Sequence, residues 1–306
     1  MSLFPLVSII CPAFNAAETL RECVESVREQ SYKNFEMIIV NDGSTDKTES
    51  VANDLSNLDQ RIKVISQPNN GSCVARNKGF SAATGKYVSA IDADDLWPPW
   101  KLEEQVRILE LNPESIVIGG VRRFGIEKGQ WVWYRKTFPF SYETKEKYLR
   151  KLINIDVNSM VLLNTFCAPK KFIIEEGWDP AIKTGHDWEV WIRLAKRHPF
   201  ITVKKIYQYY RKSNTSITRK NSIKIVVESR IIVTERHGFE ILGSDVGVKR
   251  LISKRLLSLA QISYDNNNIS EAWYCLGKAL KYRQIFYNKE FYKLFLKNIL
   301  RGINVK

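Results

Sequence analysis

The chain has 306 residues, 44% of them hydrophobic and 11% aromatic, which suffices for one large α/β domain with an appendage or for two modest domains. Five scattered cysteines without a CxxC pair and three separated histidines exclude a disulfide framework and a zinc site of usual spacing. The net charge is +14, but residues 1–119 carry 11 Lys/Arg and 17 Asp/Glu, so the basic surplus lies entirely in the rest of the chain.

Residues 1–119 alternate between short apolar runs and segments with helical periodicity. The predicted strands span 7–11, 35–40, 62–65, 87–91 and 116–118, and the predicted helices span 16–30, 46–58, 72–83 and 100–111. Near-continuous apolar strands joined by helical crossovers favour an α/β fold, with a mostly parallel sheet and helices on both faces. Ligands bind such sheets beyond the carboxyl ends of the strands, where the unusual polar residues of this region fall.

After Gly120 the pattern loosens. Residues 121–150 are rich in Trp, Tyr and basic residues, which indicates excursion strands or a substrate-facing loop. A strand over 157–163 and a helix over 187–196 are predicted next. From residue 221 onward the chain reads as helical, with predicted breaks at Gly238, Gly243 and the turn 265–268. We therefore expect three regions: residues 1–119, 120–220 and 221–306.

The motif DADD, residues 92–95, directly follows an apolar run that we predict to be a buried strand. Three carboxylates at the end of one strand repel each other, so a cation between them is expected. Hard oxygen ligands suit Mg²⁺ or Mn²⁺, usually with substrate phosphates completing the shell. The alternative is an acidic turn whose last member, Asp95, caps the helix that Pro98 and Pro99 open. Capping explains one aspartate but not three.

Two further polar turns follow predicted strands. In Asn41-Asp42-Gly43-Ser44-Thr45-Asp46, Gly43 permits a left-handed turn and Asp46 can cap the next helix. That leaves Asp42 free at the sheet edge, where it could accept the imide N–H of a uracil ring. In Pro12-Ala13-Phe14-Asn15, the Phe14 ring either stacks on a base or packs against the first helix.

Two segments bring further candidate residues. Arg76 lies in a small-residue turn that opens the third helix, and its fork suits a phosphate or a carboxylate. In Gly185-His186-Asp187-Trp188, Asp187 is either a helix N-cap or an ionised base beside an aromatic plate, Trp188, that packs on a sugar ring. An aspartate is ionised at neutral pH, so it can take a hydroxyl proton as the transition state forms.

Together these segments resemble the family 2 glycosyltransferases, an inverting group with a GT-A fold. The matching motifs are VSIICPAFNA, NDGSTD, GSCVARNKG, DADD with WPPWKLE, GHDWEVWIRLA and YRKSNTSIT, which cover residues 5–218 in the expected order. The resemblance implies Asp42 for the nucleobase, Asp92 and Asp94 for the ribose and the metal-diphosphate, and Asp187 as the catalytic base. The donor-binding residues expected on this basis are Pro12, Phe14, Asn15, Asp42, Arg76, Asp92, Ala93 and Asp94. The expected acceptor-binding residues are His186 and Trp188.

Two positions depart from the family pattern. His186 stands where the family commonly has Glu, which bears on the acceptor pocket. The element YRxH reads Tyr210-Arg211-Lys212-Ser213 and lacks its histidine, so diphosphate contacts pass to Lys212 or Arg211, or are absent. Neither departure touches the Asp92–Asp94 pair or Asp187, so we still expect catalysis.

The resemblance implies transfer of a sugar from a nucleotide-diphosphate donor, with UDP expected, to a glycan or a polyprenyl-diphosphate-linked acceptor. It also implies a divalent cofactor, Mn²⁺ or Mg²⁺, held by Asp94 and Asp92. Residues 1–119 would form the nucleotide-sugar-binding half of the GT-A domain, residues 120–220 its acceptor-binding half, and residues 221–306 a basic helical C-terminal region. Two alternatives are a nucleotidyltransferase and a non-catalytic basic scaffold or nucleic-acid binder. The first has no need of Asp187-Trp188 and the second no need of DADD.

The location is expected to be cytoplasmic, because no uncharged apolar run approaches about 18 residues and Pro5 and Pro12 interrupt the N-terminal apolar run. A stripe of Lys289, Lys293, Lys297 and Arg301 recurs every four residues near the C-terminus. Such a helix either lies on an anionic membrane, on its inner face, or packs on the domain with solvated lysines.

Overall fold

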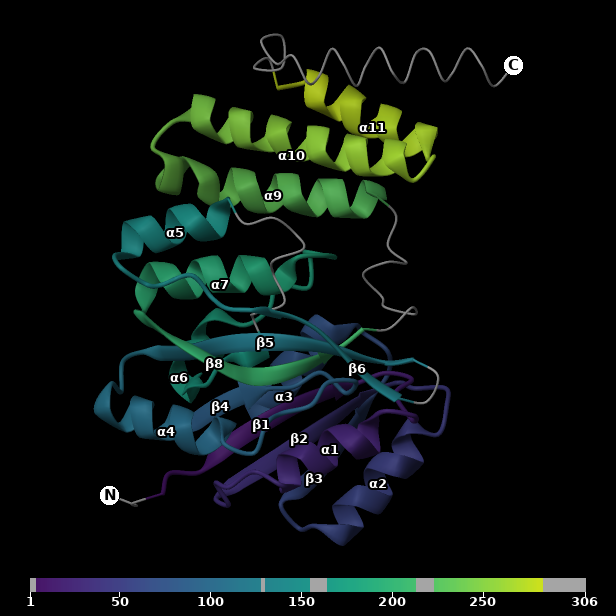
Figure 1. Cartoon of the computed structure of the whole chain (residues 1–306), viewed down its shortest axis with the longest axis vertical. Coiled ribbons are helices and arrows are strands. Elements are labelled where there is room, and N and C mark those ends of the chain that lie inside the picture. Colours follow the sequence, from purple (N-terminus) through teal and green to yellow (C-terminus); the bar gives the residue numbers. More distant parts are fainter. Residues whose placement is uncertain (1–3, 128–129, 155–163, 213–222, 283–306) are drawn as a thin grey trace. The chain divides into compact units, whose positions relative to one another are not determined.

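A computed structural model describes residues 4–127, 130–154, 164–212 and 223–282 (Figure 1). The chain divides into two compact units. The first comprises residues 1–151, 155–180 and 186–214, and the second comprises residues 152–154, 181–185 and 215–306. The first unit contains all the strands named below and every candidate donor, metal and base residue, so the site is described within it.

The first unit contains a five-stranded sheet with the strand order β3-β2-β1-β4-β7. Its strands are β1 (Val7–Ala13), β2 (Phe35–Asp42), β3 (Ile62–Gln67), β4 (Tyr87–Ala90) and β7 (Ala168–Pro169). Neighbouring strands β1 to β4 run parallel, and only β7 pairs antiparallel. Strands β1, β2 and β4 are buried almost throughout, as their continuous apolar runs predict for a sheet covered on both faces. The expected mostly parallel α/β fold is confirmed.

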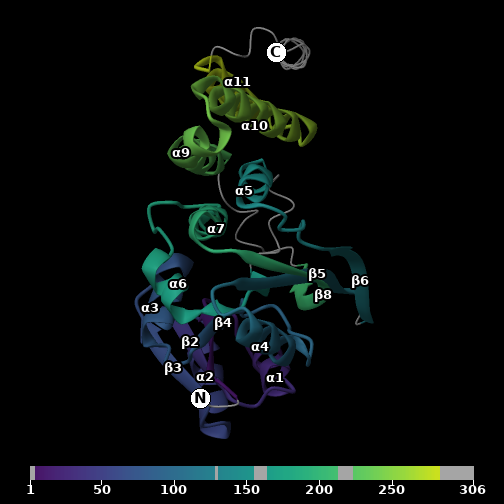
Figure 2. The same cartoon turned by 90° about the vertical axis from the view of Figure 1, so that its left-hand side faces the viewer.

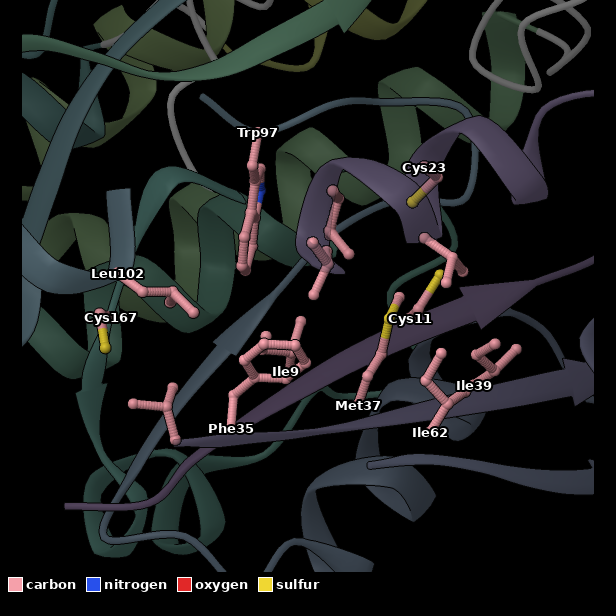
Figure 3. Packing of buried hydrophobic residues seen from close by; sticks show 14 of the residues in the cluster. Ile9, Cys11, Cys23, Phe35, Met37, Ile39, Ile62, Trp97, Leu102 and Cys167 are labelled. Atoms are coloured by element: carbon pink, nitrogen blue, oxygen red, sulfur yellow. The ribbon is translucent and has the colours of Figure 1, made fainter. Parts of the chain in front are cut away.

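Helices cover both faces of this sheet (Figure 2). Helix α3 (Ser72–Ala82) lies on one face, where the missing side chain of Gly79 lets its backbone approach Ile10 and Val40. Helices α1 (Leu20–Arg28) and α4 (Lys101–Leu111) lie on the other face and join a buried cluster with alternate strand residues such as Ile9 and Met37 (Figure 3). Helix α2 (Thr48–Leu58) packs beside α1 and β3.

A second sheet of three strands, in the order β6-β5-β8, differs most from the sequence prediction. Strand β5 (Ile116–Glu127) is far longer than the expected 116–118, and β6 (Gln130–Thr137) returns antiparallel to it as an excursion strand. Strand β8 (Phe200–Arg211), which runs parallel to β5, was not predicted. Its half-buried residues do not alternate regularly, so no period of two marked it. The predicted strand over 157–163 lies outside the described residues.

Three more helices complete the connections: α5 (Lys145–Ile153), α6 (Lys170–Glu176) and α7 (His186–Arg197). The second unit contains α9 (Ile223–Leu242), α10 (Asp245–Asp265) and α11 (Ile269–Leu280) around their own apolar cluster. The predicted break at Gly238 is wrong, because α9 continues through it and this glycine packs closely on Val248. The predicted breaks at Gly243, which has φ +74°, and at the turn before α11 are confirmed.

Among the helices of the described residues, none is long and apolar enough to cross a membrane. The basic stripe from Lys289 to Arg301 lies outside the described residues.

Candidate active site

The loops that follow β1 and β2 are joined by Asn15. The side-chain oxygen of Asn15 accepts a hydrogen bond from the Thr45 backbone N–H at 2.8 Å, and the backbone N–H of Asn15 donates to the Ser44 hydroxyl at 3.1 Å. Asn15 has φ 50° and Gly43 has φ 67°, so both loops turn through the left-handed region. Pro12 is half-buried at the end of β1, and the ring of Phe14 is 41% exposed. Phe14 is thus accessible to a ligand, and its stacking on a base stays a prediction.

Asp42 is not the free carboxylate that its sequence position suggested. It is buried, and it accepts hydrogen bonds from the Gln67 amide at 2.7 Å and from the backbone N–H groups of Asn70 and Gly71, both at 2.9 Å. A buried carboxylate requires such donors, and the last residue of β3 and the loop after it supply them. Asp42 thus holds that loop against the end of β2, and its contact with a nucleobase stays a prediction.

Arg76 connects the end of β4 to the start of α7. Its guanidinium donates to the Asp92 carboxylate at 2.6 Å, lies 3.3 Å from the His186 ring nitrogen Nε2 and approaches the Asp187 carboxylate at 3.6 Å. The Arg76 side chain is only 5% exposed, whereas 31% of Asp92 and 27% of Asp187 are exposed. Arg76 thus contacts carboxylates of the chain itself, and its predicted role in donor binding stays a prediction. A buried cation thus holds two accessible carboxylates from separate motifs together.

Asp187 receives a second anchor from Trp178, whose indole N–H donates to it at 2.7 Å. Burial raises the pKa of Asp187, but Arg76, His186 and the Trp178 N–H outweigh it, so the pKa lies below its usual value. Its place in the first turn of α7 also favours the anion through the helix dipole. Asp187 is therefore ionised and directed, as a catalytic base must be.

His186 and Trp188, which flank Asp187 in the sequence, lie in different surroundings in the structure. His186 is partly exposed beside Arg76, and burial is the main cause that lowers its pKa. Trp188 is 1% exposed, so its prediction as an acceptor-binding plate is wrong. The first turn of α7 places its large ring among core residues, where a bulky apolar side chain gains most. The aromatic residue that contacts Asp187 is Trp178, nine positions earlier.

The acidic residues after β4 take three different roles. Asp92 also accepts from the Asn164 amide at 2.6 Å. Asp95 is fully buried and accepts from the Arg211 backbone N–H at 2.8 Å and from the Gln208 amide, so its alternative role as a cap of α4 is wrong. The carboxylate of Asp94, in the described part of the chain, receives no hydrogen bond from another residue. Burial, with the nearby Asp92 charge, raises the pKa of Asp94 to about 6.

These carboxylates fit a divalent cation only in combination with a ligand. No cluster of three or more His, Cys, Asp or Glu side chains that could hold a metal ion occurs within the described residues. In the described part of the chain the Asp94 carboxylate accepts no hydrogen bond from another residue, and burial and the Asp92 charge disfavour its ionised form. A carboxylate of this kind is suited to share a cation with phosphate oxygens. Asp92 is already engaged by Arg76 and Asn164, so Asp94 is the better candidate of the pair. Ala93 lies buried between them and brings no polar side chain.

Several site residues had no recognisable sequence signal. Asn164 and Gln208 lie far along the chain from the motifs that they contact, and Trp178 lies close to Asp187 in sequence but outside any motif. Arg211 was singled out for a diphosphate, but its guanidinium donates to the Asp94 carbonyl at 2.7 Å and pairs with Glu22 on α1. A direct contact between Arg211 and a diphosphate stays a prediction.

The chain belongs to glycosyl transferase family 2, because the profile of the family described as "Glycosyl transferase family 2" matches residues 8–174. The stretch includes the loops after β1 and β2, Arg76, and the acidic residues after β4. Asp187 and Trp178 lie beyond it. The resemblance stated from the motifs is thereby confirmed.

Relatives and solved structures agree with this family. The chain is 43% identical over 106 residues to "Putative teichuronic acid biosynthesis glycosyltransferase TuaG" of Bacillus subtilis, which is 34% of this chain and 42% of that protein. It is 34% identical over 194 residues to "Uncharacterized glycosyltransferase RT0329" of Rickettsia typhi, 63% of this chain and 59% of that protein. The matches thus span less than two thirds of each relative.

The structure resembles S. aureus TarS 1-349 in complex with UDP-GlcNAc, with a TM-score of 0.65 and 18% identity, over 90% of this chain and 81% of that chain. At this identity the likeness shows the fold alone. It confirms the expected GT-A type architecture.

Proposed function

We propose that this protein is an inverting glycosyltransferase that moves a sugar from a nucleotide-diphosphate donor, preferably a UDP-sugar, to a hydroxyl group of a glycan or a polyprenyl-diphosphate-linked acceptor. The product would belong to a surface polysaccharide or glycolipid. Membership of family 2 supports the class of reaction. A TarS structure holds UDP-GlcNAc, which supports the choice of donor by analogy of fold.

One observation carries the proposal: Arg76 contacts Asp92 at 2.6 Å and approaches Asp187 at 3.6 Å. Asp92 belongs to the edge of the sheet where α/β folds bind nucleotides. Asp187 is an ionised carboxylate at a helix start. The proposed donor-binding carboxylate and the proposed base therefore contact the same buried guanidinium, which supports a shared site for donor and acceptor.

The chemistry follows from these two ends. Asp187 takes the proton of the acceptor hydroxyl as its oxygen bonds to the anomeric carbon from the face opposite the leaving group. The bond between that carbon and the diphosphate oxygen breaks, and the nucleoside diphosphate leaves with the electron pair. One displacement inverts the configuration. Arg76 holds Asp92 and Asp187 in place during this step, because its charge offsets the repulsion between them.

Asp94 and Asp92 are proposed to hold Mn²⁺ or Mg²⁺ together with the donor diphosphate. Bound there, the cation would neutralise the negative charge that grows on the leaving group. Nucleobase contact is assigned to Asp42 and Phe14, and the acceptor contact to His186. Residues 1–119 would then serve the donor and residues 120–220 the acceptor, with 221–306 as a helical addition.

The test is release of nucleoside diphosphate from UDP-, GDP- and dTDP-sugars with Mn²⁺, compared between the wild type and variants. We expect Asp187→Asn to leave nucleotide affinity almost unchanged and to cut transfer by about 10² or more. Asp94→Ala should instead weaken metal-dependent nucleotide binding. Asp54→Asn, an exposed change on α2, is the matched control. If both site variants lost nucleotide affinity equally, the division of roles between base and donor site would be wrong.

A further inference from the structure

One face of the three-stranded sheet carries a series of aromatic side chains. The aromatic face consists of Phe124 on β5, Trp131 and Trp133 on β6, and Tyr209 on β8. Figure 1 shows these three strands, with β6 as the outer one. The Trp131 ring stacks on Phe124 with centroids 4.8 Å apart, and Trp133 meets the edge of Tyr209 at 5.0 Å. Trp131 and Trp133 themselves are 6.0 Å apart at 29°. Because the register pairs Phe124 with Trp133, these rings share one side of the sheet.

The aromatic face begins directly beside the candidate donor site. The guanidinium of Arg211 lies 4.7 Å above the Phe124 ring and donates to the Asp94 carbonyl at 2.7 Å. Tyr209 is fixed to Leu96, just after DADD, by two backbone hydrogen bonds of 2.8 and 3.0 Å. A single side chain therefore separates Asp94 from the aromatic face. The aromatic face and Asp94 therefore adjoin each other in the structure.

The two tryptophans remain open although their neighbours are buried. Phe124 is fully buried, whereas Trp131 is 44% and Trp133 40% exposed. Exposed rings in one contiguous patch mark an interaction surface more often than chance. The Trp131 ring packs on Phe124, and the Trp133 ring packs against the Arg122 guanidinium. Both rings are therefore held in place by their neighbours. Flat plates of this kind suit the apolar faces of sugar rings better than they suit insertion into a bilayer.

Positive charge accompanies the rings. The Arg122 guanidinium lies 4.4 Å above the Trp133 ring, and its Nε is buried without a hydrogen-bond partner in the described part of the chain. Arg135 and Lys136 on β6 are exposed beyond the tryptophans. Neutral sugars need no such charge, but phosphate or carboxylate groups along a glycan would pair with it.

We propose that the aromatic face is an acceptor subsite that binds a glycan carrying phosphate or carboxylate groups, with sugar rings on Trp131 and Trp133 and anionic groups toward Arg122. The proposal rests on the proposed transferase function, whose acceptor class it names. It assigns to β5 and β6 the part of acceptor binding that Trp188, buried in the core, does not supply.

The test measures binding of three oligosaccharide sets to the full-length protein without donor: ribitol-phosphate oligomers, oligogalacturonates and neutral isomalto-oligosaccharides. We expect at least one anionic set to bind more tightly than the neutral set. Trp131→Ala and Trp133→Ala should raise its Kd about tenfold, whereas Trp131→Phe, which keeps a ring, should change it less than about threefold. Arg122→Gln should weaken only the anionic sets and reduce their salt dependence.

Matched controls are Trp100→Ala, which removes a 38% exposed tryptophan outside the aromatic face, and Lys145→Gln, which removes an exposed charge on α5. Both should leave Kd within about twofold. Unchanged UDP affinity and circular dichroism in each variant establish that it is folded.

The proposal is overturned if no oligosaccharide set binds the wild type or if both tryptophan variants bind normally. Binding to phosphatidylglycerol vesicles is measured in parallel. If the tryptophan variants lose only vesicle binding, the aromatic face contacts a lipid surface and the proposal is also overturned. Failure of the wild type to bind UDP with Mn²⁺ would instead count against the transferase function, because glycan binding is measured without donor.

Discussion

At the scale of single residues, the proposed base Asp187 is held by neighbouring side chains from outside its own helix. Trp178 donates its indole N–H to the carboxylate, and the Trp178 ring stacks on Phe80 with centroids 5.1 Å apart at 7°. The Asn77 side chain bonds both the N–H and the carbonyl of Trp178, at 2.8 and 2.7 Å. The indole is therefore fixed before any substrate binds, and so is the direction of Asp187.

Replacing Trp178 with Phe should keep the stack on Phe80 but remove the N–H donor. We expect kcat to fall about tenfold with little change in the donor KM, because a hydrogen bond to a charged group contributes about 1.5–3 kcal/mol. Without that donor the pKa of Asp187 rises, so the acid limb of the rate profile should move to higher pH. The measurement is a pH–rate series on transfer.

The control for this variant is Trp191→Phe, which removes a buried indole of equal size that stacks edge-on with Phe166 and Phe200. It should lower thermal stability without moving the acid limb. Equal shifts of the acid limb in both variants would show that Trp178 acts only through packing.

At the scale of elements, helix α3 links Asp92 to the residues around Asp187. It carries Arg76 toward Asp92 and carries Asn77 and Phe80 toward Trp178. Its closeness to the sheet depends on Gly79, where an added Cβ would meet Ile10 at 2.4 Å and Val40 at 3.1 Å. A displaced α3 would therefore move both ends of the site together.

Gly79→Ala should lower the free energy of unfolding by about 1–3 kcal/mol, because overpacking a close helix–sheet contact forces a backbone shift. It should also lower both nucleotide affinity and transfer. Urea unfolding and nucleotide titration check this. Ser81→Ala, at an exposed position of the same helix, should change neither. Wild-type stability of Gly79→Ala would mean that α3 has room to relax.

Glu36 joins three elements at the opposite end of the sheet. It accepts from the Ser8 hydroxyl on β1 at 2.6 Å, from the Thr84 N–H at 2.7 Å and from Lys63 on β3 at 2.7 Å. Burial raises the pKa of Glu36, but these donors outweigh it and lower the pKa from 4.5 to about 2. Because the pKa of Glu36 is lower in the folded state than in the unfolded state, its ionisation stabilises the fold at a pH above about 4.5. This contribution is lost as the pH falls from about 4.5 to about 2.

Glu36→Gln should therefore lower the free energy of unfolding at pH 7 by about 1–3 kcal/mol, since an amide faces the same donors without the charge. The wild type should lose this advantage between about pH 4.5 and pH 2, so the two stability curves converge there. Chemical unfolding over a pH series measures the difference. Glu18→Gln, an exposed change, should run parallel to the wild type. A constant gap down to pH 2 would contradict the linkage to Glu36.

At the scale of the whole molecule, charge is divided along the chain. The net charge is +14, yet the first 119 residues are acidic overall, with 11 Lys/Arg and 17 Asp/Glu. Any electrostatic attraction to an anionic membrane would therefore come from residues 120–306. It supports a peripheral membrane position as part of the proposed function, because a lipid-linked acceptor would be presented there.

The full-length protein should sediment with vesicles that contain about 30% phosphatidylserine at low salt and be released at about 0.5 M salt, where surface attraction is screened. Neutral phosphatidylcholine vesicles are the control and should retain little protein at any salt. Equal retention on both vesicle types would point to apolar contact and contradict the electrostatic account.

Much of the fold was readable from local patterns. The continuous apolar runs of β1, β2 and β4 determined a buried parallel sheet, and the polar turns after them indicated the candidate ligand site. The family followed from motifs in that half of the chain. Strand β8 and the full length of β5 were missed, because their burial depends on pairing between segments about 80 residues apart.

The sequence by itself determined the acidic motif, the candidate base at the start of α7 and the mostly parallel sheet built from the first four strands. Only the tertiary structure decided which aromatic residue serves Asp187, where the Asp42 carboxylate is bound and that Asp95 anchors β8. The physical reason is that periodicity and turn chemistry act between near neighbours. Hydrogen-bond partners and burial of single side chains depend on which distant segments the sheet brings together.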